Sequence, residues 1–228
     1  MITRAKKRVS KHRVAKEAST PVLPDSVTPD QAAESPSKRE QILNAVVTVF
    51  STRGYRATLV DEIAREAGVA KGTLYLYFQS KEQMYMEALR ENIEKLHALT
   101  VARMEEASST WDKIKALIAV RLEFGKAHKK FLRIYLSEFA VSYAARGKSS
   151  ERLRTLVQKE SELLQRVFEK GIRAGEVRAA PPEQLVAILQ DIVRGIMASR
   201  LTGFRSSESE LDPDLIVDLL RKGLGASN

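Results

Sequence analysis

Apolar residues recur along most of this chain at intervals of three and four positions, the spacing of one face of an α-helix. The first run starts near Ser37 and predicts an amphipathic helix that ends at Gly54. Its apolar members are Ile42, Ala45, Val46, Val49 and Phe50. Alternating apolar and polar positions, which would indicate half-buried strands, are absent from the sequence.

Two short helices are expected next. Thr58 and Asp61 have the spacing of a capping box, in which two residues at a helix start satisfy free backbone amides, so the second helix is predicted over residues 58–68. Gly68 ends it, because glycine readily adopts the left-handed backbone that closes many helices. A third helix is predicted over residues 70–77.

The rest of the chain reads as one helix after another. Ser80 and Gln83 form a second capping box, which begins a helix that runs to about residue 106. Serine, glycine and proline residues separate the later candidates. These span residues 110–127, 129–146, 149–174, 182–203 and 212–223. The predicted fold class is all-α, with an N-terminal three-helix head and a C-terminal helical bundle.

The first 36 residues lack an apolar period and contain four of the seven prolines. Such a segment buries too little surface to offset its ordering entropy, so we expect it to be disordered. The chain is therefore divided into an arm over residues 1–36, a head over residues 37–84 and a helical body over residues 85–228.

The formal charge of +9 is concentrated at the start of this arm. Residues 1–16 contain seven lysines and arginines and no acid, so the remaining 212 residues net only about +2. A basic segment favours polyanions, either nucleic acid or an anionic membrane surface. No apolar run approaches the roughly 20 residues that span a bilayer, and none resembles a signal peptide, so a cytoplasmic protein is expected. The absence of cysteine excludes disulfides, thiolate catalysis and cysteine zinc sites.

Residues 58–68 and 70–77, joined by a tight turn, have the arrangement of a helix-turn-helix. The second helix of such a pair enters the major groove of DNA by its N-terminal end, which carries Lys71, Gly72 and Thr73 here. Gly72 permits a close approach of the backbone. Thr73 can donate or accept a hydrogen bond, or offer its methyl group to thymine.

Three residues further on favour phosphate contacts. Tyr75 and Tyr77 bring phenol hydroxyls within reach of the DNA backbone, and Lys81 begins the next helix, where its charge and the helix N-terminus both favour an anion. The plainer alternative is that both tyrosines are packing aromatics and that the lysines are solvated surface charges.

Residues 58–89 resemble the DNA-binding head of the TetR family. The matching elements are Gly-Tyr after the first helix, then I-A-x-x-A-G-V, K-G-T-L-Y-x-Y-F and S-K-E, in order and without gaps. The resemblance covers about residues 38–90 and implies a core role for Val69, Leu74 and Phe78. It implies groove contacts from Lys71, Gly72, Thr73 and Tyr75 and phosphate contacts from Thr58, Tyr77 and Lys81.

Two positions depart from the family pattern. Leu59 stands where the family often has a hydroxyl residue, which removes a possible phosphate contact. Ala70 stands where a serine often caps the recognition helix, and the loss of such a cap costs about 1 kcal/mol.

The family resemblance also implies a small-molecule effector bound within the helical body. The candidate pocket residues are Trp111, Phe124, Phe131, Tyr135, Phe139 and Phe168. The plainer alternative is that these aromatic residues are ordinary core. Arg121, Glu123, Arg133 and Glu138 lie within otherwise apolar helices, and one that points inward would need a partner, which a ligand could provide.

A single head reads few base pairs, and two-fold symmetric proteins match palindromic sites, so a homodimer on a palindromic operator is expected. The last two predicted helices supply the interface. Its candidate residues are Leu185, Leu189, Ile192, Ile196, Leu215 and Leu219.

An enzyme or a metal site has little support. His12, His97 and His128 are the only histidines, and no spacing pairs them with each other or with a carboxylate as metal ligands or catalytic groups. Phosphate-binding, dinucleotide-binding and nucleophile motifs are absent, so no cofactor is expected.

The helix-turn-helix and the family resemblance together predict a sequence-specific, ligand-responsive transcriptional regulator, with a repressor favoured over an activator. The alternative is an architectural DNA-binding protein without an effector.

Deletion of residues 1–36 should weaken binding to operator and to random DNA by a similar factor, because the seven positive charges of residues 1–16 neutralise phosphates without reading sequence. The slope of log affinity against log salt should become shallower. A salt titration of full-length and truncated protein on both DNAs measures this. An unchanged slope would make the arm a passive tail, and a selective loss of operator binding would mean that it reads sequence.

Overall fold

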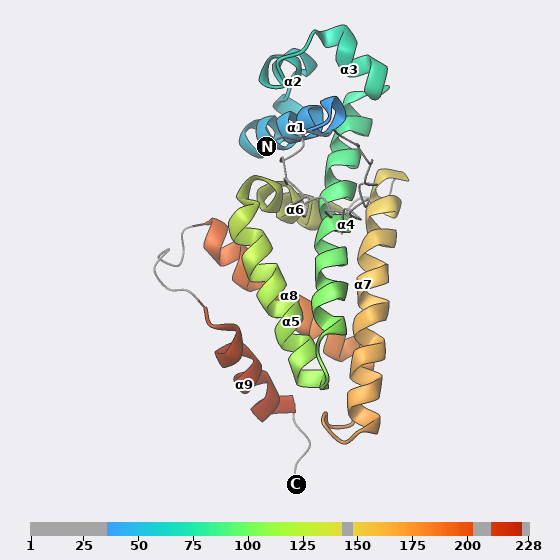
Figure 1. Cartoon of the computed structure of the whole chain (residues 1–228), viewed down its shortest axis with the longest axis vertical. Helices are drawn as coiled ribbons and strands as arrows, with labels where there is room; N and C mark the ends of the chain where they lie inside the picture. Colours follow the sequence, from blue (N-terminus) through green and yellow to red (C-terminus); the bar gives the residue numbers. More distant parts are fainter. Residues whose placement is uncertain (1–35, 143–147, 203–210, 225–228) are drawn as a thin grey trace, which may run out of the picture. The chain divides into compact units, whose positions relative to one another are not determined.

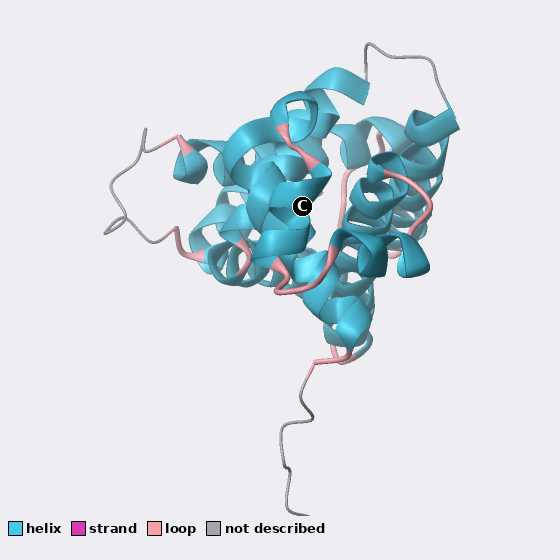
Figure 2. Cartoon of the chain, turned by 90° about the horizontal axis from the view of Figure 1, so that it is seen from above, coloured by secondary structure: helices cyan, strands magenta, loops and turns pink. Residues whose placement is uncertain are grey.

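The structure is a computed structural model that describes residues 36–142, 148–202 and 211–224. The described residues form nine α-helices joined by turns, which confirms the predicted all-α fold (Figures 1 and 2). Their bounds are α1 Lys38–Ala57, α2 Val60–Glu66, α3 Lys71–Tyr77, α4 Lys81–Glu105, α5 Thr110–Ala127, α6 Lys129–Ser142, α7 Lys148–Arg173, α8 Pro182–Leu201 and α9 Pro213–Leu224. The predicted arm lies outside the described residues, except for Pro36.

Helix α1 begins where the apolar pattern places it. The Ser37 hydroxyl accepts a hydrogen bond from the Glu40 amide at 3.2 Å, and the Glu40 carboxylate accepts one from the Ser37 amide at 2.9 Å. This reciprocal cap satisfies two amides that a helix start leaves free. The apolar stripe of α1 is buried, with Ile42 and Val46 fully inaccessible.

The start of α2 differs from the prediction. Its N-cap is Leu59, and the Thr58 hydroxyl instead donates to the Gly54 carbonyl at 2.8 Å, so the predicted Thr58–Asp61 capping box is wrong. Glu62 accepts from the Leu59 amide at 3.1 Å. The physical reason is Gly54, whose φ of +75° breaks α1 and turns the chain so that the Thr58 side chain faces inward.

The next two helix boundaries lie close to their predicted places. Gly68 closes α2 with a φ of +61°, and Ser80 caps α4 by accepting from the Gln83 amide at 3.1 Å. The Gln83 side chain accepts from the Gln79 amide, one residue earlier than the predicted box requires. Ala70 precedes α3 without a side-chain hydrogen bond, as the sequence indicated.

The head and the body share one long helix. The first half of α4 packs with α1, α2 and α3, and the same hydrophobic cluster continues into α5 and α6. We call this cluster the head core, although it includes residues of α5 and α6. Its buried members include Ile42, Ile63, Leu74, Phe78, Tyr85, Leu89, Phe124 and Phe131. The boundary predicted between residues 84 and 85 therefore falls inside α4, and no linker separates the head from the body (Figure 1).

A second hydrophobic cluster, which we call the body core, fills the body between α5, α7, α8 and α9. Its buried members include Trp111, Ile118, Leu164, Phe168, Leu185 and Leu189. The two clusters meet along α5 and α6, because Tyr135 packs against both of them. A change in the packing of the body can therefore reach the helices that carry the head.

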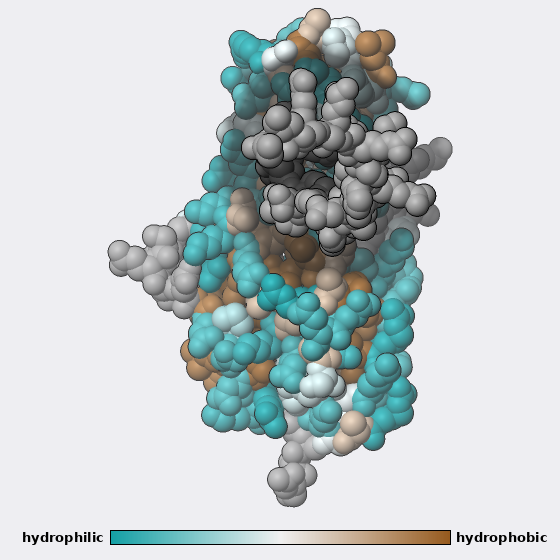
Figure 3. All heavy atoms as spheres, in the orientation of Figure 1, coloured by the Kyte–Doolittle hydropathy of each residue, from teal (hydrophilic) through white to brown (hydrophobic). Residues whose placement is uncertain are grey.

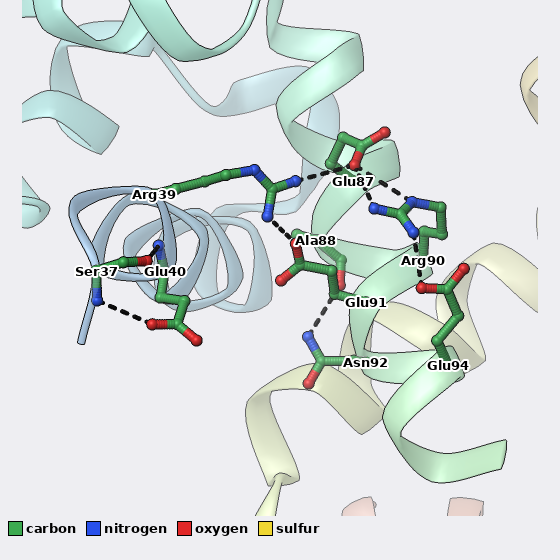
Figure 4. A network of polar contacts seen from close by, with 9 residues as sticks. All are labelled: Ser37, Arg39, Glu40, Glu87, Ala88, Arg90, Glu91, Asn92 and Glu94. Atoms are coloured by element: carbon green, nitrogen blue, oxygen red, sulfur yellow. Dashed lines mark hydrogen bonds and ion pairs between the residues drawn. The ribbon is translucent and has the colours of Figure 1, made fainter. Parts of the chain in front are cut away.

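Ion pairs fasten α1 to α4 (Figure 4). Arg39 on α1 contacts Glu87 at 3.1 Å and also pairs with Glu91, while Arg90 joins Glu87 to Glu94 along α4. Arg39 also lies over the Phe78 ring, with 5.5 Å from its guanidinium carbon to the ring centre. The position of the head thus depends on the surface of α4.

Candidate functional site

The turn between α2 and α3 is tightly held. The Gly68 amide donates to the Arg65 carbonyl at 3.1 Å and the Val69 amide donates to the Ala64 carbonyl at 3.0 Å, the two bonds of a Schellman motif. The Gln41 side chain donates to the Ala67 carbonyl at 2.9 Å and so links this turn to α1. These bonds determine the direction in which α3 leaves α2.

Helix α3 has one buried and one exposed face. Leu74 and Phe78 anchor it in the head core, as predicted, and Val69 is partly buried against the same cluster. The opposite face carries the predicted DNA-contacting side chains. Lys71, Gly72, Tyr75 and Tyr77 are exposed, and Thr73 is partly exposed. The structure therefore brings these five residues together on one free surface.

Lys71 has an acidic neighbour on α2. Its ammonium group donates to Asp61 at 2.9 Å, and this hydrogen bond raises the pKa of Lys71 above its usual value. Both side chains are well exposed, so the pair is easily exchanged for a phosphate or a base edge. Asp61 holds Lys71 on the surface of the head without removing its charge.

Two predicted phosphate contacts occupy different environments. The Thr58 side chain is only 1% exposed and its hydroxyl is used by Gly54, so it is a structural residue and the predicted contact is wrong. Lys81 donates to the carbonyls of Tyr55 at 2.9 Å and Thr58 at 3.0 Å, and lies over the Tyr55 ring. Lys81 thus satisfies carbonyls that the break at Gly54 leaves outside the helix.

Two exposed leucines on the head were not predicted as site residues. Leu76 on α3 is 83% exposed and Leu59 at the start of α2 is 63% exposed. Large apolar side chains in open water are costly, and those on a groove-binding surface suit the methyl groups of thymine. The sequence could have indicated their exposure, because neither leucine lies at a position that continues the apolar face of its helix.

A small cavity lies in the body between α4, α5, α6, α7 and α8, and we call it the central cavity. Its polar lining residues are Arg121, Tyr135, Glu160, Gln190 and Arg194. Its apolar lining residues are Ile93, Leu117, Val157, Val193 and Met197. Its volume is about 30 Å³, which is room for about one water molecule. An organic effector therefore requires the lining side chains to move apart.

Arg121 is the inward-pointing charge that the sequence indicated. Its side chain is 7% exposed and pairs with Glu160 of α7, which is 16% exposed. Burial, together with the nearby positive charge of Arg194, lowers the pKa of Arg121, and burial raises the pKa of the Tyr135 phenol. Glu123 instead lies at the surface, 3.7 Å from Arg103.

The predicted aromatic pocket needs correction. Tyr135 lines the central cavity, whereas Phe124 and Phe131 pack edge to face in the head core, and Trp111 and Phe168 are buried in the body core. The Trp111 indole donates to the Glu176 carbonyl at 3.1 Å. The rings other than Tyr135 fill space between helices, and the cavity is otherwise lined by aliphatic, amide and charged side chains. The side chain of Phe139 lies outside the described residues.

His97 lies on α4, close to Arg121. Its Nδ1 atom is buried without a hydrogen-bond partner, and burial, with Arg121 and Lys159 nearby, lowers the pKa of its imidazole. At neutral pH this histidine is uncharged. Among the described residues, no three histidine or acidic side chains are close enough to hold a metal ion.

The predicted interface residues divide into two groups. Leu185 and Leu189 are buried in the body core of their own chain, so their assignment to the surface of a dimer is wrong. Ile192 and Ile196 are partly buried, and Leu215 and Leu219 on α9 are exposed. Ile188, one turn before Ile192, is 48% exposed and was missed because the apolar period of α8 is continuous. Figure 3 shows apolar surface among polar side chains on the body.

No helix in the described part of the chain combines the length and apolar character needed to cross a membrane.

The two short helices, their tightly held turn and the free face of the second helix define a helix-turn-helix DNA-binding protein. The family model for bacterial regulatory proteins of the tetR family matches residues 42–88. The HTH-type transcriptional repressor KstR2 of Rhodococcus jostii is 30% identical over 150 residues, which cover 66% of this chain and 72% of that protein. The chain belongs to the TetR family of transcriptional regulators, so the prediction that it is not an enzyme is confirmed.

One further relative and one solved structure extend the comparison. The KstR2 repressor of Mycolicibacterium smegmatis is 35% identical over 97 residues, which is 42% of this chain and about half, 47%, of that relative. The solved structure of the regulator FadR from Bacillus subtilis in complex with stearoyl-CoA has a TM-score of 0.67 and 19% identity. The match covers 80% of this chain and 95% of the FadR chain, so the likeness extends over head and body.

Replacement of Gly72 by alanine should separate stability from DNA binding. A Cβ atom at Gly72 meets no atom within 4 Å, and alanine favours helix, so the free energy of unfolding should rise by about 0.5–1 kcal/mol. Operator affinity should fall about tenfold or more, because the added methyl group holds α3 away from the base edges.

Gly54→Ala is the matched comparison. Its Cβ also meets no atom, but its φ of +75° is a glycine conformation, so stability should fall by about 1–3 kcal/mol. Urea unfolding followed by the fluorescence of Trp111, the one tryptophan, measures both changes, and fluorescence anisotropy measures DNA binding. Equal operator affinity in Gly72→Ala and the unmutated protein would place α3 outside the groove.

Proposed function

We propose that this protein is a ligand-responsive repressor that acts in the cytoplasm as a homodimer on a palindromic operator. The observation that carries the proposal is the free face of α3, which presents Lys71, Thr73 and Tyr75 while Leu74 and Phe78 hold the helix in the head core. The N-terminal half of α3 is therefore available to a major groove. The family and the relatives named repressors support the direction of regulation.

The response to an effector would act through the head core. The central cavity is lined by Ile93 of α4 and Tyr135 of α6, and both helices pack against α1. Opening the cavity separates these helices, which changes the angle at which α1 and the rest of the head rest on α4. Two heads of a dimer then no longer match two half-sites spaced by one helical turn of DNA. The relative that was solved with stearoyl-CoA supports an organic effector.

Operator binding should depend on the free face of α3. An operator is first obtained by selection from random DNA. Lys71→Ala, Thr73→Ala and Tyr75→Ala should each weaken binding by about tenfold or more, since one base contact contributes about 1–3 kcal/mol. Leu99→Ala, an exposed residue of α4, serves as the control with unchanged affinity. Normal affinity in all three head variants would refute the assignment of α3 as the recognition helix.

The architectural alternative is tested in the same assay. A repressor with an effector is stabilised by a small molecule that also lowers its affinity for the selected operator. An architectural protein binds random DNA nearly as well as the selected sequence, and no small molecule changes this preference.

The dimer should depend on the exposed residues of α8 and α9. Ile188→Glu and Leu219→Glu should each convert a dimer into a monomer of 25.5 kDa in sedimentation experiments, because a charge replaces apolar contact area. Leu99→Glu on α4 is a matched control, since the exposure of Leu99 lies between those of Ile188 and Leu219 but it is on another helix. A monomer at micromolar concentration in the unmutated protein would contradict the homodimer.

A further inference from the structure

The central cavity holds a buried ion pair that an effector can replace. We propose that the effector carries a carboxylate, which takes the place of Glu160 on Arg121 and so releases α7 from α5. This inference rests on the proposed function and adds the chemical class of the effector. Its apolar part would lie against the aliphatic lining of the cavity.

The first argument is the burial of Arg121. A guanidinium with a 7% exposed side chain needs an anion, because an unpaired charge in an apolar interior is strongly unfavourable. Glu160 supplies that anion through Nη2 of Arg121. Even a paired buried charge gains little net stability, since desolvation offsets most of the attraction. Arg121 is thus held in the cavity by a partner that another carboxylate can replace at small cost.

The second argument is the balance of charge around the cavity. Arg121 and Arg194 both line it, and among the described lining residues Glu160 supplies the carboxylate. Asp191, which pairs with Arg194, has a 73% exposed side chain and does not line the cavity. His97 adds no charge at neutral pH, because burial lowers the pKa of its imidazole. An anionic ligand inside the cavity would therefore meet these two guanidinium groups, which favour it over a neutral or cationic one.

The third argument is that the two partners of the pair belong to different helices. Arg121 lies on α5, which also contributes Phe124 to the head core, whereas Glu160 lies on α7 and is the more exposed of the two. Glu160 can therefore turn toward solvent when it is displaced, while Arg121 remains inside. The exchange of one carboxylate for another breaks an α5–α7 contact without leaving a buried charge unpaired.

The walls of the cavity indicate the rest of the ligand. Ile93, Leu117, Val157, Val193 and Met197 are aliphatic, so a carboxylate with a hydrocarbon chain fits them. The volume of about 30 Å³ is far below that of such a molecule, so binding requires the helices to separate. Ligand binding is thereby coupled to the position of α4 and α6.

The test uses the full-length protein with decanoate as the probe and decanamide as its uncharged match. Decanoate should raise the melting temperature and weaken operator binding, and decanamide should do neither. Glu160→Gln should bind decanoate about tenfold more tightly, because the internal competitor is gone and the binding-competent fraction rises. Arg121→Met should lose the response. The double variant Arg121→Met/Glu160→Gln, which has no buried charge at this pair, shows that any loss is not a failure to fold.

Equal effects of decanoate and decanamide, or a full response in Arg121→Met, would overturn the proposal. So would the absence of any decanoate binding in both the unmutated protein and Glu160→Gln. Stearoyl-CoA is included as a separate effector candidate. Release of operator by stearoyl-CoA that is unaffected by Arg121→Met would leave the ligand-responsive repressor standing and remove the carboxylate exchange, so the two failures are distinguishable.

Discussion

The packing of α1 on α4 is the interaction on which the rest of this structure depends. Neither α2 nor α3 is long enough to be stable alone, since each has seven residues and isolated helices of that length do not persist in water. They are ordered because Ile63, Leu74 and Phe78 enter the cluster that α1 and α4 create. Arg39 then fixes the rotation of α1 on α4 through two carboxylates (Figure 4).

This arrangement makes the head and the body one mechanical unit. Because α4 runs without interruption from Lys81 to Glu105, its N-terminal half belongs to the head core, and Ile93 in the middle of the helix belongs to that core and also lines the central cavity. A close-packed interior transmits displacement, so separation of the lining helices cannot leave the head unchanged. The same packing places Lys81 of α4 beside the break at Gly54, where its ammonium group donates hydrogen bonds to the carbonyls of Tyr55 and Thr58.

The two parts of the molecule place their charges differently. On the head, Lys71 and Asp61 are exposed, so each can exchange its partner for solvent. In the body, Arg121 and Glu160 are shielded from water, so each depends on the other. A surface ion pair contributes little to stability, whereas the loss of one partner from a buried pair costs several kcal/mol. Only the buried pair is therefore suited to link a binding event to helix packing.

The sequence by itself determined the helices, the all-α class and the helix-turn-helix, because these depend on local apolar periods, caps and glycines. The start at Ser37, the turn at Gly68 and the cap at Ser80 all involve contacts within a few residues. Tertiary structure alone decided which long-range partners meet. Thr58 turned inward because of Gly54, and Leu185 and Leu189 belong to their own core, since a continuous apolar face does not reveal what covers it. The aromatic side chains of the body other than Tyr135 fill the spaces between helices. The cavity is lined in part by a buried ion pair whose partners are 39 residues apart, a separation at which no local pattern pairs them.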